Sequence, residues 1–189
     1  MSSVARANRA VFLDRDGVLN SVVMRGGVVS SPWSRDEFSI VPEAAAFCEA
    51  LRGQGWLLVV VTNQPDVARG NLPEDELDAM HAALRRLLHP DAIEVCTSGD
   101  DGDRRRKPNP GMLLDAAERL GIDLAHSWIL GDSRKDMAAG RAAGVRTLLL
   151  ATSYNSAAHD AADAVVPSLA DALAIITKSR GGASDETIL

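Results

Sequence analysis

The sequence predicts an α/β fold in which a mostly parallel sheet is covered by helices on both faces. Two observations lead to this prediction. Short apolar segments alternate with longer amphipathic segments, and residues 56–61 (WLLVVV) form a continuous, largely β-branched run. Such a run is typical of a strand buried on both faces of a parallel sheet. At 189 residues, the chain is long enough for one domain with a small insertion.

Taken in chain order, five apolar segments are expected to form strands. They are 10–13, 56–61, 93–96, 128–130 and 145–150, and a last apolar pair, Val165-Val166, follows them. Segments of helical length separate these strands. Repeated strand–helix units of this kind favour parallel pairing, because the chain crosses back before each new strand.

Five segments have the pattern of amphipathic helices: 42–52, 73–88, 110–120, 135–143 and 168–177. Three of them begin with a proline, which fits the first turn because the N–H there has no partner within the helix. A glycine follows three of them, as is common at a helix C-terminus. Residues 17–40 are too irregular for one long element. They are expected to form a small flap or hairpin over the site, too short for a large cap domain.

The domain is expected to span 10–178, after an N-terminal extension at 1–9 and before a flexible C-terminal tail at 179–189. The net charge of −6 argues against nucleic acid and anionic membranes as partners. No apolar run is long enough for a membrane span, and the N-terminus lacks the pattern of a signal peptide. The two cysteines, Cys48 and Cys96, are too few for a disulfide framework or a four-thiolate zinc site. We expect a cytoplasmic protein that is a monomer or a small homo-oligomer.

Polar residues follow three of the predicted strands. They are Asp14-Arg15-Asp16-Gly17 after the first, Thr62-Asn63-Gln64 after the second, and Gly131-Asp132-Ser133 after 128–130, with Asp136 four residues beyond Asp132. In an open α/β sheet, ligands bind outside the carboxyl ends of the strands. The sequence therefore predicts that these groups converge in one site at that edge.

Asp14, Asp16 and Asp132 are candidate magnesium ligands. Asp14 and Asp16 are two positions apart, so in an extended chain they point to the same side. Adjacent carboxylates repel each other unless a cation lies between them. Mg²⁺ takes hard oxygen ligands and leaves positions for phosphate oxygens. The structural alternative is that Asp16-Gly17 ends a strand in a turn and that Gly131-Asp132-Ser133 caps a helix.

Four consecutive cations, Arg104 to Lys107, precede the predicted helix at 110–120. Charge clusters of this kind are usually solvated surface runs. Alternatively, one or two of these side chains face the carboxylate edge and bind an anion, with lysine as a point charge and arginine as a bidentate fork. The carboxylates expected at this edge favour a pocket role for Lys107.

Together, these groups suit phosphoryl transfer to an aspartate. A carboxylate that attacks a phosphate dianion needs Mg²⁺, a lysine and a hydroxyl or amide donor to offset the negative charge. A second aspartate can protonate the leaving oxygen and then deprotonate the water that cleaves the aspartyl-phosphate.

The motifs resemble those of the haloacid dehalogenase (HAD) phosphohydrolase superfamily: Asp14-Arg15-Asp16-Gly17-Val18, Thr62, Lys107, and Gly131-Asp132 with Asp136. The resemblance implies a Rossmann-like sheet in the HAD-like fold and a Mg²⁺-dependent phosphatase. It implies Asp14 as the nucleophile and Asp16 as the general acid/base, whose backbone carbonyl also reaches Mg²⁺. Thr62 and Lys107 are implied as phosphoryl stabilisers, Asp132 as a metal ligand and Asp136 as its support.

Longer phrases are similar to one subgroup, the D-glycero-D-manno-heptose 1,7-bisphosphate phosphatases, with the histidinol-phosphate phosphatases as near relatives. These phrases are FLDRDGVLN, VVVTNQ, RKPNPGMLLDAA and LGDSRKDMAAGRAAGV. The resemblance implies a small phosphorylated metabolite as substrate, either a heptose bisphosphate or related sugar phosphate, or histidinol phosphate. It implies substrate contacts from Asn20, Asn63, Gln64 and Arg106.

The chain departs from this subgroup in the loop 98–107. The subgroup usually has a zinc-binding loop of three cysteines and one histidine, and this chain keeps only Cys96. Tetrahedral zinc cannot be built from one such ligand, so zinc is not expected. Ser133 replaces a usual lysine and Pro65 a usual serine. These changes leave the exact substrate open.

Two interpretations from other classes are a receiver-like phospho-acceptor module and a non-catalytic binding module. In a receiver, the acceptor aspartate follows a middle strand, where this chain has Thr62-Asn63. A non-catalytic module is disfavoured because every group that the chemistry needs is present.

Overall fold

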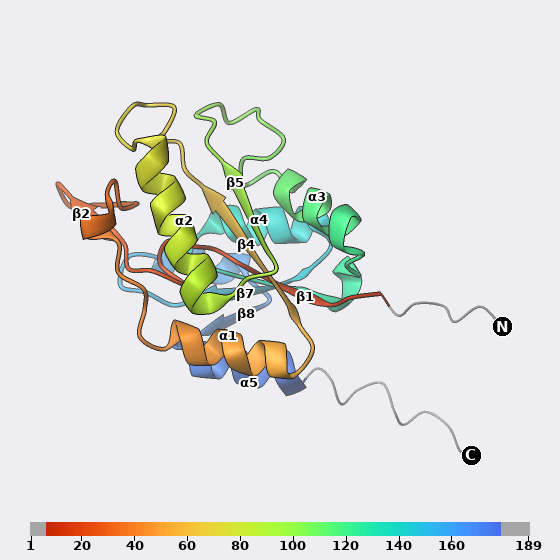
Figure 1. Ribbon diagram of the computed structural model, residues 1–189. Helices are drawn as coiled ribbons and strands as arrows, with labels where there is room; N and C mark the ends of the chain where they lie inside the picture. The colour runs from red at the N-terminus through yellow and green to blue at the C-terminus, as the bar shows by residue number, and fades with distance from the viewer. Residues whose placement is uncertain (1–6, 179–189) are drawn as a thin grey trace, which may run out of the picture.

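The computed structural model describes residues 7–178 and confirms the predicted parallel sheet (Figure 1). Six strands pair in the order β5-β4-β1-β6-β7-β8, and every neighbouring pair is parallel. They are β1 (Ala10–Leu13), β4 (Leu57–Asn63), β5 (Ala92–Cys96), β6 (Trp128–Gly131), β7 (Arg146–Leu150) and β8 (Ala164–Val166). The predicted tail at 179–189 and most of the predicted extension at 1–9 lie outside the described residues.

The α-helices of residues 7–178 match the five predicted ones closely. They are α1 (Ala44–Gly53), α2 (Glu74–Leu88), α3 (Gly111–Leu120), α4 (Arg134–Ala143) and α5 (Leu169–Lys178). Three short 3-10 helices, η1 (Arg35–Glu37), η2 (Leu124–His126) and η3 (Ser156–Ala161), lie in the connections.

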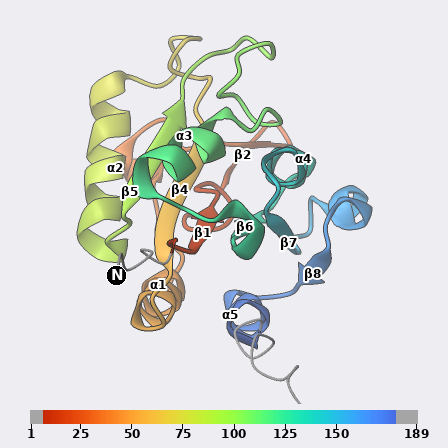
Figure 2. The same cartoon turned by 90° about the vertical axis from the view of Figure 1, so that its right-hand side faces the viewer.

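Alternate residues of the central strand β1 face two separate cores. Val11 and Leu13 pack in the core that includes α1 and α5, whereas Ala10 and Phe12 pack in the core that includes α3 and α4. Figure 2 shows α1 and α5 together below the strands and α3 and α4 above them. All four β1 residues are buried, as expected for a strand covered on both faces.

The carboxyl ends of β4, β1 and β6 meet at one edge of the sheet. Leu13 pairs with Val60 of β4 and with Leu130 of β6. The backbone N–H of Asp14 continues this pairing and donates to the carbonyl of Leu130 (3.0 Å). The residue that follows β1 is therefore fixed between two neighbouring strands.

Residues 17–40, called the flap below, contain the predicted hairpin. Strand β2 (Val23–Arg25) pairs antiparallel with β3 (Val28–Ser30). The turn between them is Gly26-Gly27, and both glycines have positive φ (57° and 80°), as this type of two-residue turn requires. No large cap domain occurs within residues 7–178, and none of the helices there is long and apolar enough to cross a membrane.

Candidate active site

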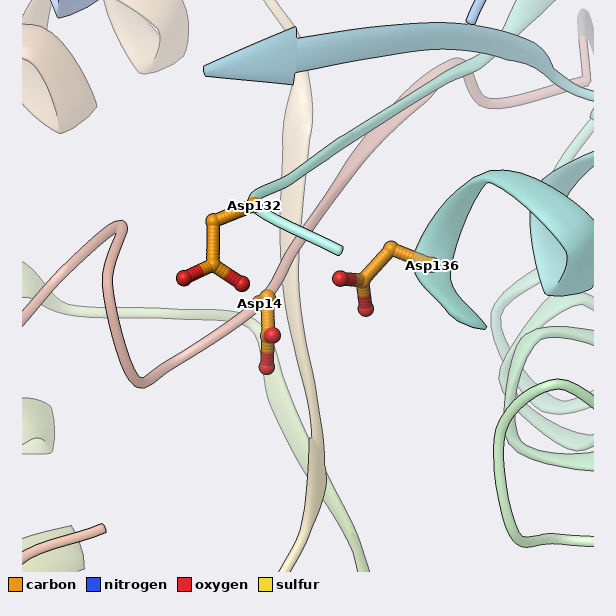
Figure 3. A group of neighbouring side chains, drawn as sticks. All are labelled: Asp14, Asp132 and Asp136. Carbon is orange, nitrogen blue, oxygen red and sulfur yellow. The ribbon is translucent and has the colours of Figure 1, made fainter. Parts of the chain in front are cut away.

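Three buried carboxylates converge at the carboxyl edge of the sheet (Figure 3). Asp14 follows β1, Asp132 follows β6, and Asp136 lies in the first turn of α4. One oxygen from each lies within 4.8 Å of the others. Three carboxylates this close repel one another strongly unless cations lie among them, so the cluster is suited to hold positive charge.

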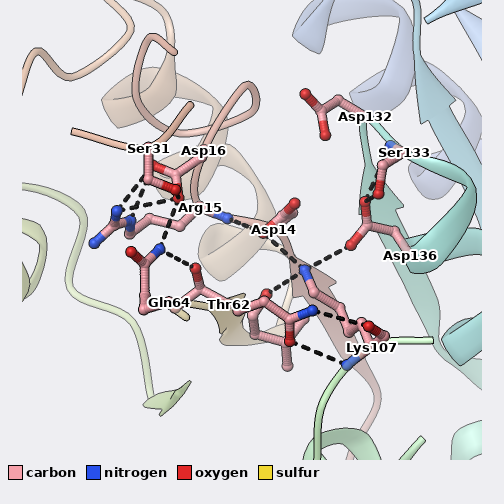
Figure 4. Close-up of polar contacts among 12 residues, drawn as sticks. Asp14, Arg15, Asp16, Ser31, Thr62, Gln64, Lys107, Asp132, Ser133 and Asp136 are labelled. Carbon is pink, nitrogen blue, oxygen red and sulfur yellow. Dashed lines mark hydrogen bonds and ion pairs between the residues drawn. The ribbon is translucent and has the colours of Figure 1, made fainter. Parts of the chain in front are cut away.

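Lys107 supplies one positive charge to this cluster. Its buried Nζ donates to Asp14 Oδ1 (2.8 Å), to Asp136 Oδ1 (2.6 Å) and to the carbonyl of Val61 (2.8 Å). Burial alone would lower the pKa of Lys107, but the charges of Asp136 and Asp14 outweigh it and raise the pKa. The lysine is therefore fully charged at neutral pH. Figure 4 shows it between the two carboxylates.

Asp136 uses both of its oxygens within the protein. Oδ1 accepts from Lys107, and Oδ2 accepts from the backbone N (3.0 Å) and the hydroxyl (2.6 Å) of Ser133 in a capping box that begins α4. Gly131 allows this close approach, because a Cβ at that position would lie 2.3 Å from the Cβ of Asp136. Asp136 is therefore fixed by Ser133 and ion-pairs with Lys107, and its supporting role stays a prediction.

Asp132 is held by residues that the sequence analysis did not identify. Its Oδ2 accepts from the Tyr154 hydroxyl (2.7 Å), and its backbone carbonyl accepts from Asn155 Nδ2 (2.8 Å). Burial raises the pKa of Asp132 to about 6, with a further rise from the charge of Asp136. Among the described residues, Oδ1 has no hydrogen-bond partner and can meet a cation. Gly17 packs against this group, because a Cβ there would lie 2.0 Å from Asp132 Oδ2.

Asp16 lies apart from the carboxylate cluster (Figure 4). The chain turns immediately after β1, where the N–H groups of Leu19 and Asn20 both donate to the carbonyl of Arg15. Asp14 and Asp16 nevertheless line the same pocket, and that they point to the same side stays a prediction. Asp16 accepts from a two-nitrogen fork of Arg15, from Asn20 and Gln64, and from the hydroxyl of Ser31 in the flap.

These contacts determine the ionisation of Asp16. Burial alone would raise the pKa of Asp16, but the Arg15 guanidinium and the hydrogen bonds from Asn20 and Gln64 lower it below the ordinary value. The carboxylate still lies on the wall of the pocket beside Asp14. It is therefore an ionised group at the edge of the site, held by several donors.

The polar residues at the carboxyl end of β4 mainly contact other site residues. Asn63 exchanges two hydrogen bonds with the backbone of Lys107, through its Nδ2 (2.9 Å) and its Oδ1 (3.0 Å). Gln64 donates from Nε2 to Asp16 Oδ2 and to Thr62 Oγ1, both at 2.7 Å. Thr62 and Gln64 are fully buried and do not line the pocket, and the same is true of Asn20. Asn20 and Gln64, which were predicted to contact substrate, bind Asp16 and do not reach the cavity.

A cavity of about 630 Å³ opens above the carboxylates. Its floor includes Asp14, Lys107 and Asp132, and the flap forms one wall with Val28, Val29 and Trp33. Four further cations line it: Arg25, Arg69, Arg106 and Lys135. Arg106 is buried, and its Nε donates to Asp101 (2.8 Å). The cavity joins a charged floor to a partly apolar wall, as expected for a site that binds an anionic ligand with a larger body.

Comparison with known proteins agrees with this geometry. The HAD-hydrolase-like family model matches residues 104–172. The D-glycero-β-D-manno-heptose-1,7-bisphosphate 7-phosphatase of Pseudomonas aeruginosa is 38% identical over 75% of this chain and 80% of its own length. The enzyme of that name from Escherichia coli K12 is 35% identical over 94% of this chain and 98% of its own length. The chain belongs to the HAD-like hydrolases.

A solved structure extends the likeness to the fold of this HAD-like hydrolase. The D,D-heptose 1,7-bisphosphate phosphatase from B. bronchiseptica, complexed with magnesium and phosphate, has a TM-score of 0.78 and 31% identity, and the match covers 90% of this chain and 99% of that one. The fold class predicted from the sequence is confirmed. The roles predicted for individual site residues stay predictions, although Asp14, Lys107, Asp132 and Asp136 lie together as the motifs required.

Proposed function

We propose that the protein is a magnesium-dependent phosphatase that hydrolyses D-glycero-D-manno-heptose 1,7-bisphosphate, or a related sugar phosphate, at the 7-phosphate. The observation that carries this proposal is Lys107, charged and buried between Asp14 and Asp136 on the floor of a cavity lined by cations. The names of the relatives at 35–38% identity support the choice of substrate. We also infer that residues 10–178 form the catalytic domain and that it works in the cytoplasm, where sugar phosphates are retained by their charge.

The residues fit Mg²⁺ as the cofactor. Oxygen donors suit this hard cation: Asp132 keeps Oδ1 free for it, and the carboxylate of Asp14, within 4.8 Å, is the second predicted ligand. Asp136 is the predicted support of this cluster, and the backbone carbonyl of Asp16 is a further predicted ligand. When bound, Mg²⁺ supplies positive charge that offsets the negative charge of the phosphoryl group.

Asp14 is the proposed nucleophile. Its Oδ1 accepts from Lys107 Nζ and from the backbone N of Arg15 (2.7 Å), so its orientation is fixed. Its Oδ2 has no partner among residues 7–178 and is free to attack phosphorus. That attack forms an aspartyl-phosphate and releases the sugar oxygen, while Lys107 stabilises the phosphoryl oxygens.

Asp16 is the proposed acid and base of the two proton transfers. It gives a proton to the leaving sugar oxygen and later takes one from the water that hydrolyses the aspartyl-phosphate. A general acid must be protonated when the substrate is bound. In the site without substrate, however, the pKa of Asp16 is lowered. The negative charge of the incoming phosphate raises the pKa of this carboxyl again, so that it binds the proton that the first step uses.

The experiment that tests this function is phosphate release from a panel that contains heptose 1,7-bisphosphate, histidinol phosphate, other sugar phosphates and nucleotides. Each substrate is measured with Mg²⁺, with a chelator and with the Asp14→Asn variant. We expect one strongly preferred sugar phosphate, with no turnover in the chelator or in the variant and full recovery when Mg²⁺ is restored. Preference for histidinol phosphate would change the substrate and keep the reaction. A folded protein that binds Mg²⁺ and releases no phosphate from any substrate would contradict the proposed reaction.

A further inference from the structure

The loop that carries Lys107 connects β5 to α3, and it contains no regular secondary structure between Cys96 and Gly111. A group that must contact two carboxylates at 2.6–2.8 Å therefore sits on an irregular segment. The hydrogen bonds of a helix or a strand therefore do not fix its position, and other contacts have to do so.

We propose that Arg105 is a positioning residue for Lys107, acting through ion pairs with Glu94 of β5 and Asp115 of α3. This inference rests on the proposed function, because it takes Lys107 to act on the phosphoryl group. Arg105 itself points away from the cavity and touches no group that reacts.

The contacts of Arg105 join three segments of the chain. Its Nη2 donates to Glu94 Oε2 (2.8 Å) and to the carbonyl of Val95 (3.3 Å), and its Nη1 donates to Asp115 Oδ2. One side chain therefore ties the loop to a strand of the sheet and to a helix packed against that sheet. A planar guanidinium with several donors suits such a double contact, whereas a lysine ammonium at this distance satisfies only one carboxylate well.

Loss of this connection is costly because Glu94 is buried. Its side chain is only 7% exposed, and its second oxygen accepts from Arg119 Nη2 of α3 (2.6 Å). A buried carboxylate that loses a cationic partner destabilises the folded protein, because the cost of removing its charge from water is no longer offset. The loop cannot leave its position without removing one of the two cations that Glu94 needs.

The backbone on either side of Arg105 is packed closely enough to transmit this restraint. Before it, the carbonyl of Arg104 accepts from the N–H of Gly111 (3.0 Å), and a Cβ at Gly111 would lie 2.3 Å from that oxygen. After it, Asn63 holds the N–H and the carbonyl of Lys107. Arg105 stands between these two fixed points, so its ion pairs hold the residues next to Lys107 against β5 and α3.

Arg104 provides a matched control. It is the neighbouring arginine and bonds the same Asp115 (2.9 Å), but its side chain is 68% exposed and it does not contact Glu94. Arg104→Ala removes one positive charge beside Asp115 of α3 and keeps the ion pair between Arg105 and Glu94 of the sheet. The comparison of the two variants therefore isolates the contact with Glu94.

The experiment measures kcat and the dissociation constant for inorganic phosphate, in the presence of Mg²⁺, for Arg105→Ala, Arg105→Lys, Arg104→Ala and the wild type. Misplacement of a reacting group by about 1 Å costs on the order of 100-fold. We expect Arg105→Ala to lower kcat roughly 10- to 100-fold and to weaken phosphate binding several-fold. Arg105→Lys recovers only part of either loss, and Arg104→Ala stays within about twofold of the wild type.

Phosphate binding separates positioning from a loss of folded protein, because a dissociation constant does not change when part of the sample is inactive. If Arg105→Ala fails to fold, Glu94→Gln replaces it, since that variant keeps the shape of the side chain and removes its charge. Unchanged phosphate affinity in a folded Arg105→Ala or Glu94→Gln variant would overturn the positioning role, as would equal losses in Arg104→Ala. A wild type that neither binds phosphate nor hydrolyses any phosphate ester would instead overturn the proposed function.

Discussion

The floor and the rim of the cavity are built in different ways. On the floor, Asp14, Asp132 and Lys107 are buried, and each has a partner from another segment of the chain. On the rim, Arg69 has a side chain that is 56% exposed, and Val28 at the tip of the flap is 68% exposed. Asp14 and Asp132 follow the ends of β1 and β6, and Lys107 reaches from its loop to Asp14 and to the carbonyl of Val61 in β4, whereas Arg69 and Val28 are largely exposed. From this difference we expect changes on the floor to affect the reaction and changes on the rim to affect substrate preference.

The largest expected effect comes from removing the cation on the floor. Lys107→Ala leaves Asp14 and Asp136 as neighbouring buried carboxylates, so we expect kcat to fall by at least about 1,000-fold and the free energy of unfolding to fall by about 3–5 kcal/mol. Steady-state kinetics and urea denaturation measure both. Mg²⁺ should return part of the lost stability, since it replaces one of the missing charges. Activity within tenfold of the wild type would remove Lys107 from the chemistry.

A second prediction concerns His81 of α2, which lies behind the floor. It is buried, and burial lowers its pKa to about 4, with further lowering from Arg15 and Arg85 and an opposing effect from Asp16. In the unfolded chain the histidine binds a proton near pH 6.5, whereas in the folded protein it does so only near pH 4. Stability is therefore complete above pH 6.5 and is lost as the pH falls towards 4, by about 3 kcal/mol in total.

The His81→Gln variant isolates this effect, because glutamine does not titrate. Urea denaturation between pH 7.5 and 4.5 should show a smaller loss of stability for the variant, with a difference in slope of up to about 1.4 kcal/mol per pH unit. Identical slopes would mean that His81 is protonated in the folded state as readily as in the unfolded chain.

A third prediction concerns Tyr154, which lies on the loop after β7 and holds Asp132 on the floor through a hydrogen bond. Tyr154→Phe removes the hydrogen bond to Asp132 Oδ2 and keeps the ring. Loss of such an outer contact typically weakens metal binding by 10- to 100-fold, and we expect about tenfold here because the residue is partly exposed. Calorimetric titration with Mg²⁺ measures it directly. Turnover at saturating Mg²⁺ should recover to near the wild-type value, and unchanged affinity would refute a role for the hydroxyl.

The smallest expected effect is on the rim. Arg69→Ala should raise KM a few-fold and leave kcat unchanged, because Arg69 lines the cavity without contacting the buried carboxylates on its floor. Arg35→Ala is the control, since Arg35 is similarly exposed and pairs with Glu76 away from the cavity. A fall in kcat in Arg69→Ala would show that the rim takes part in the reaction itself.

The fold was predictable from the sequence because local signals agree with each other. The β-branched run at 56–61, prolines at helix starts and glycines at helix ends placed each main element within about two residues of its position. The site was predictable where it follows strand ends, as with Asp14 and Asp132. The pattern of an element and the polar residues that follow a strand can both be read from residues close together in the sequence.

Residues that act through distant contacts were not predictable in this way. Asn63 holds Lys107 across 44 positions, and Tyr154 reaches Asp132 from a loop 22 positions away. Nothing in the local sequence marks these pairings. The ion pair of Asp16 with Arg15 and its hydrogen bond from Ser31 of the flap were not predicted either, because they depend on how the chain turns after β1.

The central position of β1 links the assembly of the site to the folding of the whole chain. Its neighbours β4 and β6 come from well-separated parts of the sequence, and its own segment supplies Asp14 alone to the carboxylate cluster. A fragment that ends before Trp128 lacks Asp132, Asp136 and the strand that completes one side of β1. Since non-local pairing forms slowly, we expect a refolding chain to gain helical signal before it binds Mg²⁺ and to recover activity only once β6 has docked beside β1.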